Sequence, residues 1–202
     1  MGRSVKKIIE YPKGSTPLDP NELDGLKFRH ITTHEQLNQL EQVNIQNGIA
    51  WLKRKKNLEI LSDKFVRDLH KHLLGEVWKW AGTYRNADKN IGVPYFLIID
   101  RIKYLLDDTK FWIQHQTYPP LEICMRFHHR LVFIHPFSNG NGRHARIMAS
   151  AIYEKMLHQQ PLEWNNGYDL QKMNERREKY IAALQSADQG DYDMLLQFIP
   201  SK

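Results

Sequence analysis

Residues 135–146 read His-Pro-Phe-Ser-Asn-Gly-Asn-Gly-Arg-His-Ala-Arg, and this stretch decides both the fold and the chemistry expected of the chain. Gly140 and Gly142 allow backbone angles that residues with a Cβ atom resist, so successive N–H groups can turn toward one anion. The residues from 143 to about 158 have helical periodicity, which places those N–H groups at the positive end of a helix. Arg143 and Arg146 project from one face of that helix. The stretch therefore predicts a phosphate-binding site.

His135 opens the stretch, and an imidazole can accept a proton near neutral pH. At this position it is placed to act as a general base toward a hydroxyl that attacks a bound phosphate. Each residue taken alone also has a simpler interpretation, because glycine turns precede ordinary helices and histidines occur in protein cores. Their combination in one short segment favours transfer chemistry on a nucleotide.

The same stretch resembles the signature of the Fic family, His-x-Phe-x-Asp/Glu-Gly-Asn-Gly-Arg-x-x-Arg, and departs from it at Asn139. Other segments resemble the usual surroundings of this signature in the Fic/Doc family, namely residues 80–85, 88–93 and 190–199. The N-terminal part is similar to a subgroup called mobile mystery protein B, over residues 16–26, 30–33 and 41–45. The likeness covers nearly the whole chain. It implies a mainly α, single-domain helical bundle of the Fic type with a short β-hairpin flap.

Resemblance to Fic enzymes implies protein adenylyltransferase activity, in which a Ser, Thr or Tyr hydroxyl of a target protein attacks the α-phosphate of ATP. AMP then remains on the target. His135 would be the general base, and Phe137 would anchor the loop in the core. The phosphates would be bound by the backbone of Gly140, Asn141 and Gly142 and by the side chains of Arg143 and Arg146. Glycine at position 140 favours this activity over that of the related Doc kinases, whose loop carries Lys-Arg in its second half.

Asn139 keeps a second functional class open. The family has a carboxylate at this position that holds Mg²⁺, and an amide oxygen is a weaker ligand for such a hard cation. The first class is AMP transfer with ATP as co-substrate and Mg²⁺ or Mn²⁺ as the metal. The second is a catalytically weak or inactive nucleotide-binding module of a toxin–antitoxin or gene-regulatory pair. Removal of AMP from a target, or another phosphotransfer, is a third.

The segment 83–98 is broken by Gly92 and Pro94 and is rich in β-branched residues around them, so it predicts a short hairpin. In Fic proteins this hairpin is a flap that pairs with an extended segment of the target. Four residues are therefore candidates for target positioning: Asn90, Ile91, Gly92 and Val93. The alternative is a structural hairpin without a partner, because strand addition is a common recognition mode but not a universal one.

Glu41 is a candidate for restraint of the activity. Fic enzymes are often silenced by a helix whose glutamate pairs with the last arginine of the signature. Residues 37–42 keep only the glutamate of that inhibitory pattern, so a pair between Glu41 and Arg146 is one hypothesis and an exposed helical glutamate is the other. The subgroup likeness also implies a helix-turn-helix protein, or an antitoxin, as a partner.

Composition restricts the remaining possibilities. The chain has 202 residues with 41% hydrophobic content, which suits one domain with a core. The net charge is +6, but the only dense basic run, residues 53–56, falls at a predicted helix end, so nucleic acid is not expected as a partner. Residues 1–14 lack the features of a signal peptide, and no apolar stretch is long enough to span a membrane. The single Cys124 excludes an intrachain disulfide. A cytoplasmic location is expected.

The expected layout is an extended N-terminal arm over residues 1–32 and a Fic-type helical domain over residues 33–202. Caps and apolar stripes predict helices that start at Thr33, at Ser62 or Asp63, at Asp100 and at Pro119–Pro120. The second of these is expected to run to Gly82, and two more helices are expected over about 168–186 and 191–199.

Other polar residues are assigned structural roles at this stage. The pairs His30/His34 and His128/His129 come without the further ligands that a zinc site needs. Tyr180 is interpreted as a core tyrosine in preference to a residue of an adenine pocket.

Overall fold

The computed structural model of the chain describes residues 23–28, 30–31, 33–164 and 175–199. Its helices confirm the mainly α prediction and follow in this order: α2 (His34–Arg54), α3 (Asp63–Leu74), the 3₁₀ turn η1 (Tyr95–Leu97), α4 (Ile98–His115), α5 (Pro120–Ile134), α6 (Asn141–Ala151), the π-helical η2 (Ile152–Met156), α7 (Glu175–Asp188) and α8 (Asp193–Phe198). Most of the predicted arm and the predicted helix start near residue 168 lie outside the described residues. None of the described helices has the length and apolarity needed to cross a bilayer.

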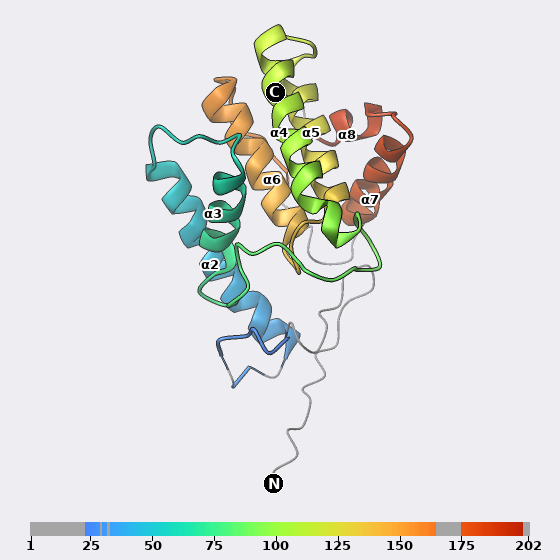
Figure 1. Ribbon diagram of the computed structural model, residues 1–202. Helices are drawn as coiled ribbons and strands as arrows, with labels where there is room; N and C mark the ends of the chain where they lie inside the picture. The colour runs from blue at the N-terminus through green and yellow to red at the C-terminus, as the bar shows by residue number, and fades with distance from the viewer. Residues whose placement is uncertain (1–22, 29, 32, 165–174, 200–202) are drawn as a thin grey trace.

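Helix α6 occupies the middle of the bundle. Figure 1 shows it between the α2–α3 pair and the α4–α5 pair, with α7 and α8 beyond α5. Fully buried side chains from four helices belong to one core: Leu69, Leu105, Phe127 and Met148. The N-terminal end of α6, where residues 135–146 enter the helix, is therefore held by packed neighbours.

Helix α2 begins as the sequence predicted. Thr33 Oγ1 accepts a hydrogen bond from the Gln36 N–H at 3.2 Å, and Gln36 Oε1 accepts one from the Thr33 N–H at 3.3 Å. This capping box satisfies two N–H groups that a helix start leaves without partners. The basic residues at the other end, Lys53 and Arg54, are exposed in the last turn. Their position agrees with a solvated helix end.

Helix α3 is shorter than predicted. Ser62 caps it as expected, but the helix ends at Leu74 and not at Gly82. The segment beyond it pairs with the N-terminal part of the chain: the Lys27 N–H donates to Val77 O and the Lys79 N–H to Gly25 O, each at 2.9 Å. These long-range bonds compete with helix continuation, and they bury Trp78 to 1% exposure.

Helices α4 and α5 begin in different ways, α4 after a 3₁₀ turn and α5 at a pair of prolines. Pro119 and Pro120 open α5, as predicted, because a proline in the first turn loses no intrahelical bond. Helix α4 starts at Ile98 and not at Asp100, since η1 leads directly into it. The core face predicted for α5 is confirmed, because Ile123, Phe127, Leu131 and Ile134 are all buried.

The predicted β-hairpin over residues 83–98 does not form. The described backbone from 83 to 94 contains bends and no strand, and η1 follows it. Its polar groups are bound by side chains instead of by a second strand: Arg85 donates to Ala87 O at 2.9 Å and to Val93 O, and Asp88 Oδ1 accepts from the Tyr95 N–H at 2.8 Å. We call residues 86–94 the flap from here on.

Replacement of Gly140 by alanine tests how tightly this packing holds the loop before α6. Gly140 has a φ of +76°, and a Cβ atom there would lie 2.4 Å from Leu74 Cδ1. We expect Gly140→Ala to lower the free energy of unfolding by roughly 2–3 kcal/mol, from left-handed strain plus overpacking. The matched control is Gly190→Ala, where φ is +88° but nothing lies within 4 Å. It should cost only about 1 kcal/mol in the same denaturant titration, and equal losses would contradict the packing argument.

Candidate active site

His135 lies directly after α5, in a left-handed backbone conformation. Its φ is 53° and its N–H donates to Leu131 O at 3.3 Å, so it ends the helix. A residue with a Cβ atom adopts this conformation at a cost, and such strain is tolerated where the surroundings fix it. The turn directs the chain away from α5 toward α6 and leaves the imidazole buried, with 8% exposure.

The two ring nitrogens of His135 have different surroundings. Nε2 is buried and has no hydrogen-bond partner in the described part of the chain, whereas the ring bonds to the backbone of Val132. This pairing assigns the proton to Nδ1 and leaves a lone pair on Nε2. Burial, followed by the positive charge of Arg85, lowers the pKa of His135 to about 4. The imidazole is therefore neutral at physiological pH and can accept a proton.

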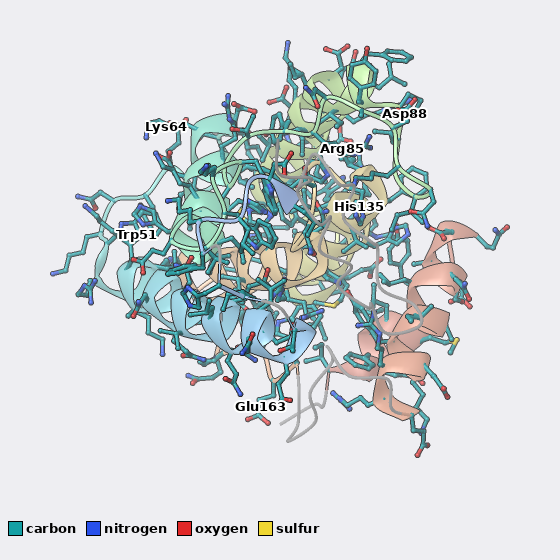
Figure 2. The ribbon with its side chains drawn as sticks, turned by 90° about the horizontal axis from the view of Figure 1, so that it is seen from below. Trp51, Lys64, Arg85, Asp88, His135 and Glu163 are labelled. Carbon is teal, nitrogen blue, oxygen red and sulfur yellow. The ribbon has the colours of Figure 1, made fainter. Side chains whose placement is uncertain are left out.

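Arg85 joins the flap to His135. Its Nε donates to His135 O at 2.7 Å and its Nη2 to Val93 O, while its own N–H donates to Pro136 O at 2.9 Å. The side chain is 1% exposed and lies between Asp88 of the flap and His135 (Figure 2). The buried guanidinium therefore ties the flap to the start of the loop through backbone carbonyls of both segments.

The predicted target-positioning residues lie on the flap next to the imidazole. Asn90, Ile91 and Gly92 are exposed and Val93 is half-buried. A Cβ atom on Gly92 would lie 2.5 Å from His135 Cβ, so only glycine permits this approach of the flap to the base. The Val93 N–H donates to Ile134 O at 3.4 Å. The structure thus brings Gly92 and Val93 beside His135, with Asn90 and Ile91 preceding them on the exposed part of the flap, although not in a hairpin.

His70 of α3 packs against the loop before α6, and the sequence analysis did not identify this role. Its ring stacks on Phe137 with centroids 3.6 Å apart, its Nδ1 accepts from the Gly82 N–H and its Nε2 donates to Asn139 O, both at 3.0 Å. Burial keeps its pKa well below the ordinary value. A histidine in an amphipathic helix gives no local signal of such a role. Phe137, fully buried, anchors the loop as predicted.

The amide side chains of the loop are engaged with its backbone. Asn141 Oδ1 accepts from the Phe137 N–H at 2.9 Å and its Nδ2 donates to Phe137 O at 2.8 Å. Asn139 Oδ1 accepts from the Gly140 N–H at 2.6 Å. Asn141 therefore closes the loop with its side chain, and its backbone N–H belongs to the first turn of α6.

The start of α6 forms a cradle for an anion. Gly140 caps the helix without a side chain, so the N–H groups of Asn141, Gly142 and Arg143 have no partner within the helix. The positive end of the helix dipole adds to them. The structure places these predicted phosphate-binding residues in one turn, immediately after the loop that His135 begins.

Glu41 pairs with Arg143, and the hypothesis of a pair with Arg146 is therefore wrong. Glu41 Oε2 accepts from Arg143 Nη1 at 2.6 Å, and Glu41 Oε1 accepts from Trp78 Nε1 at 2.6 Å. The carboxylate is 3% exposed, which also excludes the exposed helical glutamate. The hydrogen bond from Trp78 orients the Glu41 carboxylate toward α6. Trp78 reaches Glu41 because α3 ends at Leu74, which the sequence did not predict.

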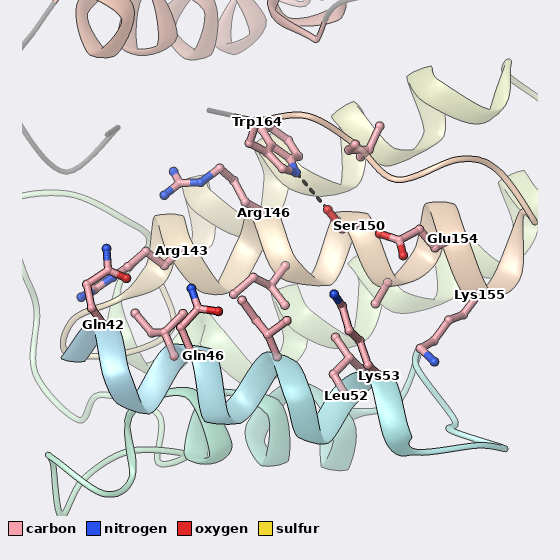
Figure 3. Close-up of a pocket in the computed structure, with 15 residues that line it drawn as sticks. Gln42, Gln46, Leu52, Lys53, Arg143, Arg146, Ser150, Glu154, Lys155 and Trp164 are labelled. Carbon is pink, nitrogen blue, oxygen red and sulfur yellow. Dashed lines mark hydrogen bonds between the residues drawn. The ribbon is translucent and has the colours of Figure 1, made fainter. Parts of the chain in front are cut away.

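A cavity of about 410 Å³ lies between α2 and α6. Figure 3 shows Arg143 and Arg146 at one end and Lys53, Glu154 and Lys155 at the other. Apolar side chains from both helices line its middle, including Ile45, Ile49 and Ile147, and Trp164 borders it with its Nε1 bonded to Ser150 Oγ at 3.0 Å. Both arginines of the stretch thus line this cavity.

Comparison with known protein sequences identifies related proteins. A family model described as Fic/DOC family matches residues 60–153. The protein adenylyltransferase Fic of Aedes aegypti is 27% identical over 157 residues, covering 74% of this chain and 29% of that protein. A probable protein adenylyltransferase of Aquifex aeolicus is 23% identical over 208 residues, covering 92% of this chain and 58% of that protein. The chain thus spans less than two thirds of the length of either relative.

Solved structures share the fold. BepC of Bartonella tribocorum, determined with bound AMPPNP, has a TM-score of 0.64 at 15% identity and covers 93% of this chain and 92% of its own. Fic-1 of C. elegans has a TM-score of 0.61 at 22% identity, covering 87% of this chain and 50% of that one. The matched residues 60–153 include α3 to α6 and the whole 135–146 stretch. This chain carries a Fic/DOC family domain.

Proposed function

We propose that this chain is a protein adenylyltransferase that transfers AMP from ATP to a hydroxyl side chain of a target protein. One observation carries the proposal: Nε2 of His135, which has no hydrogen-bond partner among the described residues, lies on the same short loop that leads into the first turn of α6. The family domain supports it, and so do the names of the two relatives described above, which are protein adenylyltransferases.

The reaction is a displacement at the α-phosphorus of ATP. The oxygen of the target hydroxyl bonds to that phosphorus, and the bond from phosphorus to the oxygen that bridges the α- and β-phosphates breaks. Pyrophosphate leaves with the electron pair, and the hydroxyl proton passes to Nε2 of His135. The first N–H groups of α6, with Arg143 and Arg146, stabilise the charge that develops on the phosphates.

We assign target positioning to the flap. Asn90, Ile91 and Gly92 expose their edge of the flap to solvent, and Arg85 fixes the same segment against His135. A target segment that lies along the flap brings a Ser, Thr or Tyr hydroxyl toward the imidazole. Main-chain pairing of this kind is a common mode of peptide recognition.

The loop does not form a metal site on its own. No carboxylate occurs between His135 and Arg146, and the two side-chain amide oxygens, those of Asn139 and Asn141, already accept hydrogen bonds from the N–H groups of Gly140 and Phe137. Within the described ranges no three His, Cys, Asp or Glu side chains converge. We therefore propose that Mg²⁺ or Mn²⁺ enters as the ATP complex, held by the phosphates, which hard cations prefer as ligands.

Transfer of label from ATP tests the function. Purified protein and a lysate receive ATP labelled at the α- or the γ-phosphate, beside His135→Ala. We expect protein labelled from the α-phosphate only, with a rate about 10²- to 10⁴-fold lower for the variant because it lacks the base. Label from the γ-phosphate would show a kinase instead.

A weak or inactive nucleotide-binding module is the second candidate, and Asn139 favours it. Absence of α-label in the wild-type protein, together with measurable ATP binding, would support this alternative. Asn139→Asp then separates its causes: recovered transfer assigns the defect to the missing carboxylate, and a folded but silent variant excludes that cause. Loss of AMP from a modified target would indicate the reverse reaction.

The pH dependence of transfer follows from the depressed pKa of His135. With a pKa of about 4 the base form of His135 persists at pH 5 to 6, where an ordinary imidazole is largely protonated. We expect the acid limb of kcat/KM to fall toward pH 4 and not near 6.5. Circular dichroism at each pH is the control for folding, because His128 and His144 are also buried and neutral and favour unfolding as pH falls. An acid limb near 6.5 in a folded protein would show that the imidazole is solvated during turnover.

We propose that Glu41 restrains the transferase. Its carboxylate holds Arg143 in a largely buried ion pair, in which the Glu41 side chain is 3% exposed and the Arg143 side chain 14%. An arginine engaged in this way is not available to the terminal phosphates of ATP. A partner that displaces α2, such as the predicted helix-turn-helix protein or antitoxin, would release it.

Glu41→Gln is expected to raise the transfer rate about tenfold, a typical size for coupling between a restraint and a site. Glutamine keeps an oxygen for Trp78 Nε1 but removes the charge that holds Arg143. Glu35→Gln, in the first turn of the same helix and exposed, is the matched control and should change nothing. Unchanged transfer by a folded Glu41→Gln protein would remove the restraint hypothesis.

A further inference from the structure

Two adjacent histidines of α5 each bind a tyrosine from the C-terminal helical region. His128 Nε2 lies 3.0 Å from Tyr180 Oη, and His129 Nδ1 lies 3.1 Å from Tyr192 Oη. The two pairs are alike in chemistry but face different parts of the molecule. Only the first of them reaches the phosphate cradle.

Tyr180 contacts the second arginine of the stretch. The Arg146 guanidinium carbon lies 5.6 Å from the centroid of the Tyr180 ring, within the range of a cation–π interaction. A Cβ atom placed on Gly142 would lie 3.6 Å from Arg146 Nη1 and 4.0 Å from Tyr180 Oη. The hydroxyl and the guanidinium therefore converge on the first turn of α6.

The direction of the hydrogen bonds follows from their chemistry. A guanidinium only donates hydrogen bonds, so the Tyr180 oxygen accepts the bond from Arg146. The Tyr180 O–H can then donate a hydrogen bond to His128 Nε2. His128 is fully buried, and burial together with the charge of Arg146 lowers its pKa to about 3. A neutral imidazole accepts this hydrogen bond through its Nε2 lone pair and carries no charge that would repel the arginine.

We propose that Tyr180 is a positioning residue that, backed by His128, holds Arg146 in the orientation that binds the terminal phosphates of the nucleotide. The inference rests on the proposed function. Tyr180 is buried in the core, as interpreted from the sequence, and the proposal adds a role to this position. It also extends the site beyond residues 60–153, because α7 supplies a group to it.

Tyr192 provides a matched control. Its ring lies 4.2 Å from the guanidinium carbon of Arg126, and its partner His129 also bonds to Asp188 at 2.8 Å. None of these groups belongs to the 135–146 stretch. Tyr192→Phe therefore removes a hydroxyl from a similar pair without touching Arg146.

Calorimetric titration of the wild-type protein, Tyr180→Phe and Tyr192→Phe with ATP and with AMP tests the proposal. We expect Tyr180→Phe to weaken ATP binding about five- to tenfold, the size of one lost hydrogen bond of ordinary strength, and to leave AMP binding within about twofold. Tyr192→Phe should change neither. Equal ATP affinity for Tyr180→Phe and wild type would overturn the proposal, and an equal loss for ATP and AMP would reduce Tyr180 to a structural role.

A second measurement does not depend on the nucleotide. The Nε–H resonance of Arg146 in ¹⁵N-edited NMR spectra should shift in Tyr180→Phe and not in Tyr192→Phe, with equal thermal stability of the two variants. If the wild-type protein binds no ATP, the proposed function fails, and this resonance still decides whether Tyr180 orients Arg146. An unmoved resonance would refute that contact.

Discussion

The site depends on one imidazole, that of His70. Its ring is fully buried, stacks on Phe137, accepts a bond from the Gly82 N–H and donates one to Asn139 O. Only the neutral form can do both, because the protonated ring has two donors and no acceptor. Burial favours that form. One side chain of α3 thus joins three segments that are distant in sequence, and the loop that carries the base rests on it.

Three arginines take different roles because their neighbours differ. Arg85 is surrounded by backbone carbonyls, Arg143 faces the carboxylate of Glu41, and Arg146 faces an aromatic ring. Carbonyls hold a guanidinium in place, a carboxylate neutralises it, and a ring with a hydroxyl orients it while it keeps its charge. The same residue type therefore serves as a structural tie at Arg85, and we propose it as a restrained group at Arg143 and as an anion ligand at Arg146.

Local signals in the sequence predicted the helix starts, since a cap or an initial proline affects only the first turn of its own helix. These residues are Thr33 with Gln36, Ser62 and Pro119. The end of α3 and the shape of the flap were not predictable, because long-range hydrogen bonds decide them. The segment after α3 pairs with Gly25 and Lys27, and the buried Arg85 binds the flap backbone. The residues proposed to bind phosphate were all taken from residues 135–146, because their pattern is local. His70, Trp78 and the true partner of Glu41 could not, because each contact joins residues that are 37 to 102 positions apart.

Glu41 belongs to the same polypeptide as Arg143, and this determines how any restraint it exerts depends on protein concentration. An encounter between two groups of one chain has an effective concentration set by the fold and not by the amount of protein. Dilution or low expression therefore cannot release the arginine, and the fraction of released molecules is the same at every concentration of the chain. Only a ligand or partner with a different affinity for the two states can change that fraction.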